Sequence, residues 1–134
     1  MFLLTVNEGM NFGIPDVCLT PSPTGAIPMP YPNISNPAEA NSATAAENVV
    51  VDSAKALTLI SEISSSEGDE AGSEGGVVSG EIMGPTRFLM GSEKLFINGA
   101  PAARITSETG QNGEMMNIVG ASIVPTQTIV LVLE

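Results

Sequence analysis

The chain has 134 residues, of which 15 are acidic and 4 are basic, so its formal net charge is −11 at neutral pH. This charge repels the phosphates of nucleic acids and anionic lipids, which argues against nucleic acid as a partner. Fourteen glycines and ten prolines disfavour long helices, while short runs of Val, Ile and Leu favour strands. The sequence therefore predicts a single all-β domain over residues 1–134, with little helix.

The first third of the chain is predicted to hold a strand and a long proline-rich arm. Residues 1–6 are apolar and predict a strand. Residues 12–33 contain six prolines, and the missing N–H donors predict polyproline-like arms and turns, not a central strand. Residues 37–47 are rich in alanine and predict a short helix or an ordered loop. The proline-rich arm carries three candidates for contact with a partner: Ile27, Met29 and Tyr31. The alternative is that this proline-rich arm binds as a ligand in an aromatic groove of a partner protein.

A β-hairpin is predicted over residues 94–105. An apolar run leads into Asn98-Gly99, the strongest short-range signal for a two-residue type I′ turn, because both central residues need a positive φ. Pro101 lacks an N–H and is expected at a sheet edge or at the start of its strand.

The same hairpin is predicted a second time, 46 residues earlier. Residues 49–59 align with residues 95–105, and Asp52-Ser53 falls on the turn. The spacing of such repeats is uneven, so the sequence predicts a few divergent copies of one hairpin in one body and not a regular solenoid.

Residues 64–76 are polar, without hydrophobic periodicity, and predict a solvated loop. Calcium binding is the alternative, but the acids lack the alternate spacing of the known loop. The neighbouring acids Asp69 and Glu70 are a weak candidate for glycosidase chemistry.

The chain contains no histidine, which removes the commonest general base and zinc ligand. With no nucleophile-elbow or phosphate-loop motif either, we expect no enzyme activity, no catalytic residues and no metal ligands.

Short strands are predicted over residues 77–83 and 87–90, a turn over 109–113, and a further section from residue 115. Residues 128–133 are apolar on both faces, so they predict a strand buried in the middle of the sheet or against another body. Its side chains are the main candidates for partner binding: Ile129, Val130, Leu131, Val132 and Leu133.

The amount of apolar strand exceeds what a small sheet can bury. Residues 49–51, 95–97 and 129–133 cannot all be central strands in so short a chain. Part of this surface is therefore expected to form a flat apolar base for a partner.

Residues 101–104 read Pro-Ala-Ala-Arg, the letters that name the PAAR family, and they follow the hairpin turn as in that family. Further motifs resemble the PAAR-like branch with a Pro-Ile-Pro-Tyr-type segment; here they are residues 15–18, 27–31, 68–72 and 75–80. The resemblance covers residues 11–134. The motif positions that carry it are Asn98, Gly99, Pro101, Ala102, Ala103, Arg104, Gly68 and Asp69.

The resemblance implies the spike tip of a bacterial type VI secretion system or a related contractile injection machine. The fold it implies is a small cone of β-hairpins with pseudo-threefold symmetry. Its base would bind the trimeric VgrG spike, one copy per trimer, and its point would contact the target membrane transiently. Such a protein would be in the bacterial cytoplasm before assembly and secreted afterwards. Because Glu134 follows the last predicted strand, we expect no fused toxin, and effectors or adaptors on separate chains.

Many members of the family hold zinc near the point with three histidines and one cysteine. This chain lacks the histidines, so the resemblance gives Cys18 no ligand role and we expect no cofactor. Arg104 is expected to pair with a local carboxylate or carbonyl. Two alternatives remain open: a small acidic secreted binding module or toxin inhibitor, and an enzyme with an unusual acidic site.

Overall fold

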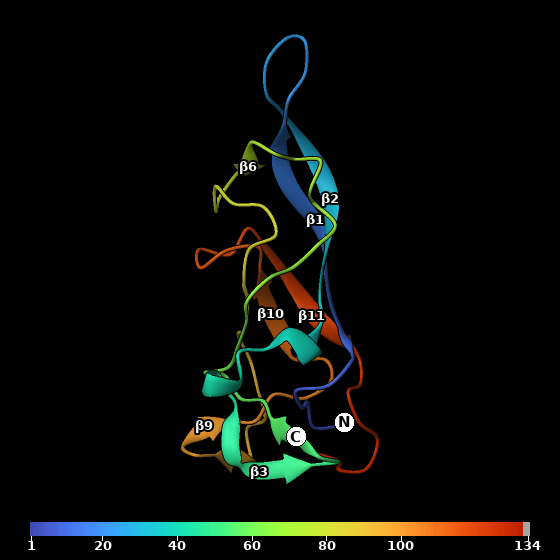
Figure 1. Cartoon of the computed structure of the whole chain (residues 1–134), viewed down its shortest axis with the longest axis vertical. Helices are drawn as coiled ribbons and strands as arrows, with labels where there is room; N and C mark the ends of the chain where they lie inside the picture. Colours follow the sequence, from blue (N-terminus) through green and yellow to red (C-terminus); the bar gives the residue numbers. More distant parts are fainter. Residues whose placement is uncertain (133–134) are drawn as a thin grey trace.

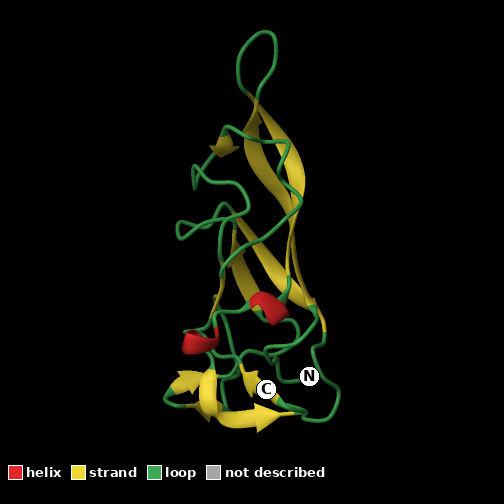
Figure 2. Cartoon of the chain, in the orientation of Figure 1, coloured by secondary structure: helices red, strands yellow, loops and turns green. Residues whose placement is uncertain are grey.

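The computed structural model describes residues 1–132 and shows a tapered, all-β body. Its narrow end is a hairpin of β1 (Met10–Thr20) and β2 (Ile27–Ser35), closed by an uncharged loop. Both ends of the described chain lie at the wide end, where the backbone N–H of Val132 donates to the carbonyl of Met1. The predicted all-β fold is confirmed: the helical elements of the described residues are the short 3₁₀ turns η1 and η2, drawn in red in Figure 2.

A seven-stranded antiparallel sheet runs along the body in the order β2-β1-β11-β10-β7-β5, with β6 pairing to β1. The two helical turns are η1 (Pro37–Glu39) and η2 (Ser42–Thr44), which lie between the sheet and the wide end. The remaining strands of this sheet are β5 (Glu62–Ile63), β6 (Gly75–Gly76), β7 (Thr86–Phe88), β10 (Glu108–Gln111) and β11 (Ile118–Val124).

Both predicted hairpins are present at the wide end. One is β3 (Ala46–Val51) with β4 (Ala54–Ala56), and the other is β8 (Phe96–Ile97) with β9 (Ala100–Pro101). The turns match, because Asp52 and Ser53 have φ of 51° and 65°, and Asn98 and Gly99 have φ of 54° and 81°. These values confirm the type I′ turn at both places.

A third copy of the hairpin is built from the two ends of the chain. Residues 130–132 take the place of the outgoing strand, and residues 1–6 take the place of the return strand. The equivalent cross-strand pairs are Val50 with Lys55, Phe96 with Pro101, and Leu131 with Phe2.

The three return segments close on one another around a central ring of backbone hydrogen bonds. Leu4 donates to the carbonyl of Ala103 over 2.9 Å, Ala103 to that of Leu57 over 2.9 Å, and Leu57 to that of Leu4 over 3.0 Å. Each link joins equivalent positions of two copies, so the predicted pseudo-threefold arrangement is confirmed in the hydrogen bonding itself.

Apolar packing is concentrated in the wide half of the body. One cluster includes Leu4, Leu57 and Ala103, and a second includes Leu3, Ile97 and Val132. The interior of the narrow half is mainly polar; its buried side chains include Asp16, Asn33, Asp69, Gln111 and Asn112. The two halves are therefore held by different forces, hydrophobic burial at the base and side-chain hydrogen bonds towards the tip.

Several local predictions were wrong. Residues 12–33 were expected to avoid central strands, yet β1 pairs with β2, β6 and β11. The structure accommodates Pro15 at a break in the register between Gly13 and Asp16, and it places the other strand prolines on β2, the edge strand. A proline at a bulge or an edge costs no ladder hydrogen bond, which is why the sheet tolerates them.

The prediction of regular strands at the two ends of the chain was also wrong for the described residues. Within residues 1–6 and 128–132 the structure has isolated bridges instead of regular ladders, because each segment supplies half of a hairpin whose other half is distant in sequence. Residues 77–83 form turns, not a strand. The loop 64–76 is not simply solvated, since Asp69 is fully buried and β6 joins the sheet.

Candidate functional site

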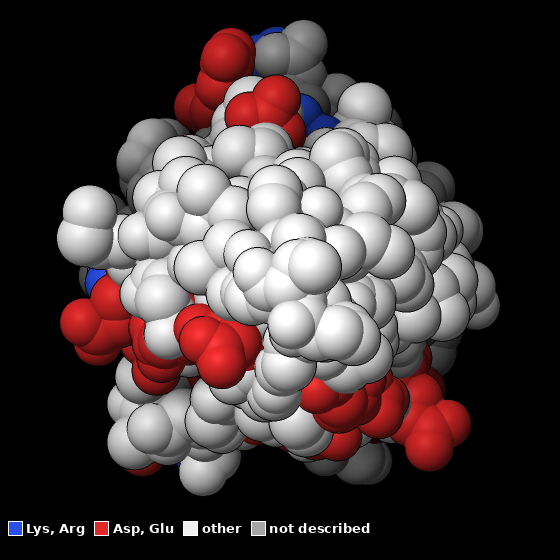
Figure 3. Space-filling model, turned by 90° about the horizontal axis from the view of Figure 1, so that it is seen from above, with Lys and Arg blue, Asp and Glu red and all other residues white. Residues whose placement is uncertain are grey.

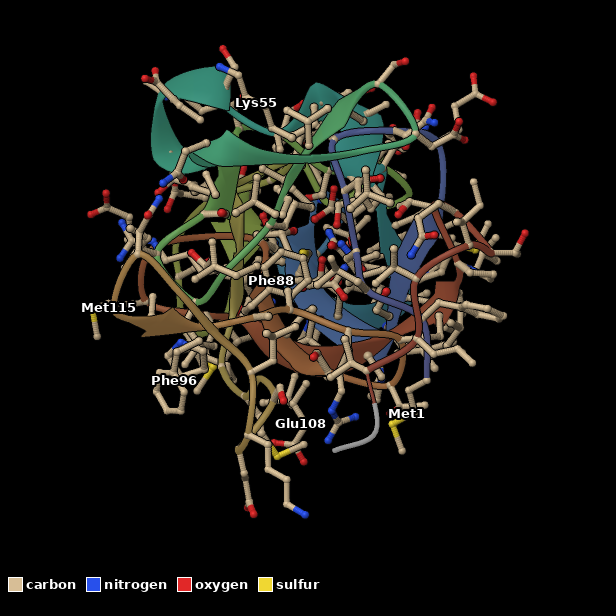
Figure 4. The ribbon with its side chains drawn as sticks, turned by 90° about the horizontal axis from the view of Figure 1, so that it is seen from below. Met1, Lys55, Phe88, Phe96, Glu108 and Met115 are labelled. Carbon is tan, nitrogen blue, oxygen red and sulfur yellow. The ribbon has the colours of Figure 1, made fainter. Side chains whose placement is uncertain are left out.

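The wide end, which we call the base, consists of the outgoing segments 49–51, 95–97 and 130–132 with their return segments. Each outgoing segment exposes one large apolar side chain at the equivalent position. Val50, Phe96 and Leu131 are 58%, 56% and 58% exposed. Figure 4 looks at this end and shows Lys55, Phe96 and Met1, one from each copy, at three separate places on its periphery. The base thus repeats one apolar feature three times.

The backbone at these positions is also open to a partner. On either side of Leu131, the N–H of Leu3 donates to the Val130 carbonyl and the N–H of Val132 donates to the Met1 carbonyl. In an antiparallel pair the intervening residue directs its N–H and C=O away from the partner strand. Among residues 1–132 the base therefore offers strand edges that have no partner strand, a feature that another chain can extend by strand addition.

The structure separates the predicted partner-binding residues into two groups. At the base, Ile129 and Leu131 are exposed, Val130 is half-buried and Val132 is 3% exposed, so Val132 belongs to the core. Leu133 lies outside the described residues.

The second group, Ile27, Met29 and Tyr31, lies on β2 towards the opposite end. The hydroxyl of Tyr31 hydrogen-bonds that of Thr20 at 2.6 Å, which ties the two strands of the tip hairpin together. Sequence reasoning could not separate the groups, because both are apolar and only the topology sends them to opposite ends.

The Pro-Ala-Ala-Arg motif has a structural role. Pro101 sits in a two-residue edge strand, as predicted, and Ala102 and Ala103 are fully buried at the centre of the base. Arg104 donates to the carbonyl of Ile105 at 3.2 Å and to the hydroxyl of Thr106 at 2.8 Å. The small side chains allow three return segments to meet, and the arginine closes the turn that follows them.

A buried polar site lies in the narrow half and was not predicted. Ligand-type atoms of Asp16, Cys18 and Asp69 lie within 4.8 Å of one another. The thiol of Cys18 donates to Asp16 at 3.7 Å and to Asp69 at 3.9 Å. The sequence carried a signal, since two of the motif segments contain these residues, but only the fold brings residue 69 to residues 16–18.

The electrostatics of this site favour protonated side chains. Burial, together with the charges of Asp16 and Asp69, raises the pKa of the Cys18 thiol to about 12. Burial and the hydrogen bond with Asp16 raise the pKa of Asp69 to about 7. At neutral pH the thiol keeps its proton, and Asp69 is poised to hold one beside Asp16.

An apolar groove of about 440 Å³ lies on the flank of the body. Leu89 and Gly110 come from the sheet side, Met115 and Met116 come from the loop before β11, and Arg87 and Glu114 pair at 3.4 Å on its margin. Methionines adapt to differently shaped partners. The groove is made from segments other than the base.

The tip itself carries no charge. The loop that joins β1 to β2 reads Pro-Ser-Pro-Thr-Gly-Ala, and Figure 3, seen from the narrow end, shows acidic side chains around an uncharged centre. Among residues 1–132 no helix is long and apolar enough to cross a membrane.

These features define a class: a small tapered β-domain with an internally threefold apolar base and a narrow, uncharged tip. The toxin PAAR-like domain family matches residues 9–120, and the chain belongs to this family. No curated protein and no solved structure matches the chain. The match confirms the resemblance to PAAR-like proteins over residues 11–120.

Proposed function

We propose that this protein is the non-enzymatic tip that caps the trimeric VgrG spike of a type VI secretion or related contractile injection system. The observation that carries the proposal is the repetition of Val50, Phe96 and Leu131 at equivalent, exposed edge positions of the base. A threefold partner presents three identical surfaces, and one asymmetric chain can meet all three only if it repeats its own contact three times.

The geometry supports end-to-end docking. Three apolar side chains beside unpaired strand edges suit a β-structured partner that ends in three strands, since strand addition and apolar burial then act together. The tapered body and the uncharged tip loop suit a transient passage through a target membrane. The chain would wait in the bacterial cytoplasm and leave with the spike. An effector or adaptor on a separate chain would bind away from the base, and the flank groove is open for it.

The test is the complex with the cognate spike protein. We expect one copy per trimer by light scattering, and a complex that survives high salt because apolar contact is not screened. Leu131→Glu, Val50→Glu and Phe96→Glu should each weaken binding, by about tenfold or more, since each places a charge in an apolar contact. Val77→Glu, a matched exposed valine near the narrow half, should bind normally.

The alternative function is that of an acidic binding module or toxin inhibitor. Its contact would use the net charge of −11 and would weaken steeply with salt. A complex lost at high salt, three copies per trimer, or equal binding by all four folded variants would refute capping through the base.

A further inference from the structure

The buried polar site of the narrow half is larger than its three ligand-type atoms, and three asparagine side chains complete it. We call the whole set the tip cluster. It comprises Asp16, Cys18, Asn33, Asp69, Asn112 and Asn117.

Two of the asparagines have an orientation that their neighbours determine. The side-chain oxygen of Asn117 accepts from the backbone N–H of Val78 at 2.8 Å and of Ser79 at 3.2 Å. That of Asn112 accepts from the N–H of Gly84 at 2.9 Å. A backbone N–H can only donate, so in both residues the amide NH₂ group must face the other way.

Asn33 is oriented by a similar contact. The amide NH₂ of Gln111 donates to the Asn33 backbone carbonyl at 3.0 Å and to its side-chain oxygen at 2.7 Å. Because the carbonyl can only accept, Gln111 is a donor here and the NH₂ group of Asn33 points inward. It lies 3.2 Å from Asp16, 3.4 Å from Asp69 and 2.9 Å from the Ser66 hydroxyl.

All three amide NH₂ groups converge on the carboxylate of Asp16. Asn33 donates to one oxygen, and Asn112, at 3.2 Å, and Asn117 donate to the other. Asn112 also donates to the Glu81 carbonyl at 2.9 Å, and Asn117 to the Val17 carbonyl at 2.9 Å. One buried charge thus collects donors from β2 and from both sides of the turn between β10 and β11.

This arrangement does not fit the zinc that many PAAR proteins carry near the point. Four-coordinate zinc needs thiolate, imidazole or carboxylate lone pairs. Here the Asp16 lone pairs already accept three amide protons, and the Cys18 thiol keeps its proton. A cation in this cluster would face the positive ends of three amide dipoles, so the donor set favours an anion at its centre.

We propose that the tip cluster replaces the metal: hydrogen bonds to the buried Asp16 carboxylate hold the narrow half together, and the cluster does not take up zinc. It joins β1, β2, the loop around residue 69, the loop 78–84 and the turn after β10. These segments are distant in sequence, and the hydrogen bonds of the cluster join them in the narrow half.

The first test uses the wild-type protein. Purified without chelator, it should contain less than about 0.1 zinc per chain by elemental analysis. Its Tm should move by less than about 1 °C on adding EDTA or a fivefold excess of zinc. One zinc per chain, with a Tm that falls in EDTA and is restored by zinc, would overturn the proposal.

The second test removes the central charge. Asp16→Asn keeps the shape but leaves amides facing an amide, and it should lower Tm by about 10 °C. Glu74→Gln, which also replaces a carboxylate by an amide but at an exposed site on the neighbouring loop, should leave Tm within about 1 °C. An unaltered Tm in Asp16→Asn would overturn the role of the carboxylate. If that variant does not fold, the loss supports the role, and the wild-type zinc measurement still decides the metal.

The Cys18→Ser variant tests whether the Cys18 thiol only packs in the tip cluster or binds zinc as a ligand. Our proposal expects the variant to respond to zinc and EDTA as the wild type does, with shifts of less than about 1 °C. A zinc response present in the wild type and lost in Cys18→Ser would identify a thiolate site and refute the metal-free tip.

Discussion

At the scale of single residues, the tip cluster shows how context changes the chemistry of a side chain. Asp69 belongs to a stretch that reads as a solvated loop, yet in the fold it is buried beside Asp16 and accepts the N–H of Met83 at 3.1 Å. Two carboxylates in one desolvated site cannot both be charged cheaply, so one of them retains a proton.

This has a consequence for stability against pH. The pKa of Asp69 rises from 3.8 to about 7 on folding, so the folded state binds the proton more tightly than the unfolded state. The stabilising effect is fully present below pH 3.8 and is lost as the pH rises through about 7. Relative to Asp69→Asn, the wild type should lose up to about 1.4 kcal/mol per pH unit in this window.

Urea unfolding at several pH values, compared between the two proteins, measures this difference. Asparagine reproduces the donor of the protonated acid, so Asp69→Asn should show a flatter profile and higher relative stability at pH 8. Parallel profiles for the two proteins would show that Asp69 holds no proton in the folded state.

At the scale of elements, the hairpin is the repeated unit of the base. The first two copies share register and turn type, although one turn is Asp-Ser and the other is Asn-Gly. The same end of each repeat carries a serine cap: the N–H of Thr58 donates to the Ser61 hydroxyl and that of Arg104 to the Ser107 hydroxyl, both at 3.0 Å. The similarity in sequence therefore reflects equal backbone geometry.

The two turns predict opposite effects of substitution. Ser53 has a φ of 65°, which is unfavourable for any residue with a Cβ atom. The Ser53→Gly variant should therefore raise the free energy of unfolding by about 1 kcal/mol. Gly99→Ala introduces that strain at a φ of 81°, in open space, and should destabilise by about 1 kcal/mol. Ser53→Ala should change little. Thermal unfolding of the three variants measures the order, and equal Tm values would argue against matched turns.

At the scale of the whole molecule, the body divides into an apolar base and a polar narrow half. The base is closed by the ring of Leu4, Leu57 and Ala103, where three segments from distant parts of the chain meet in full burial. The narrow half depends on hydrogen-bonded side chains and on loops. The base should therefore be the most stable part and the last to open.

Hydrogen exchange can test this division. The amides of Leu4, Leu57 and Ala103 should exchange slowest, near the rate of global unfolding, and those of residues 64–83 faster. Leu57→Ala should cost about 3 kcal/mol because it leaves a cavity at the ring. Ile60→Ala, at a side chain that is 67% exposed, should cost less than about 0.5 kcal/mol. Slowest exchange in the narrow half would contradict the division.

The sequence by itself determined what depends on neighbouring residues. Asn98-Gly99 specified its turn because few dipeptides tolerate two positive φ values, and the glycines and prolines excluded long helices. The similarity between residues 49–59 and residues 95–105 revealed the repeated hairpin. The Pro-Ala-Ala-Arg motif and the other motif segments indicated the family. Each of these signals acts within a short stretch of chain.

Only the tertiary structure decided the features that join distant residues. The third hairpin could not be read from the sequence, because residues 1–6 and 130–132 complete each other only when the chain ends meet. Pro15 predicts that its segment is not a central strand, but in the structure a break in the β1 register accommodates this proline. Residues 16, 33, 69, 112 and 117 form one cluster because several loops fold over β1. Local propensity does not encode such contacts, since burial and pairing between remote segments depend on the topology that brings them together.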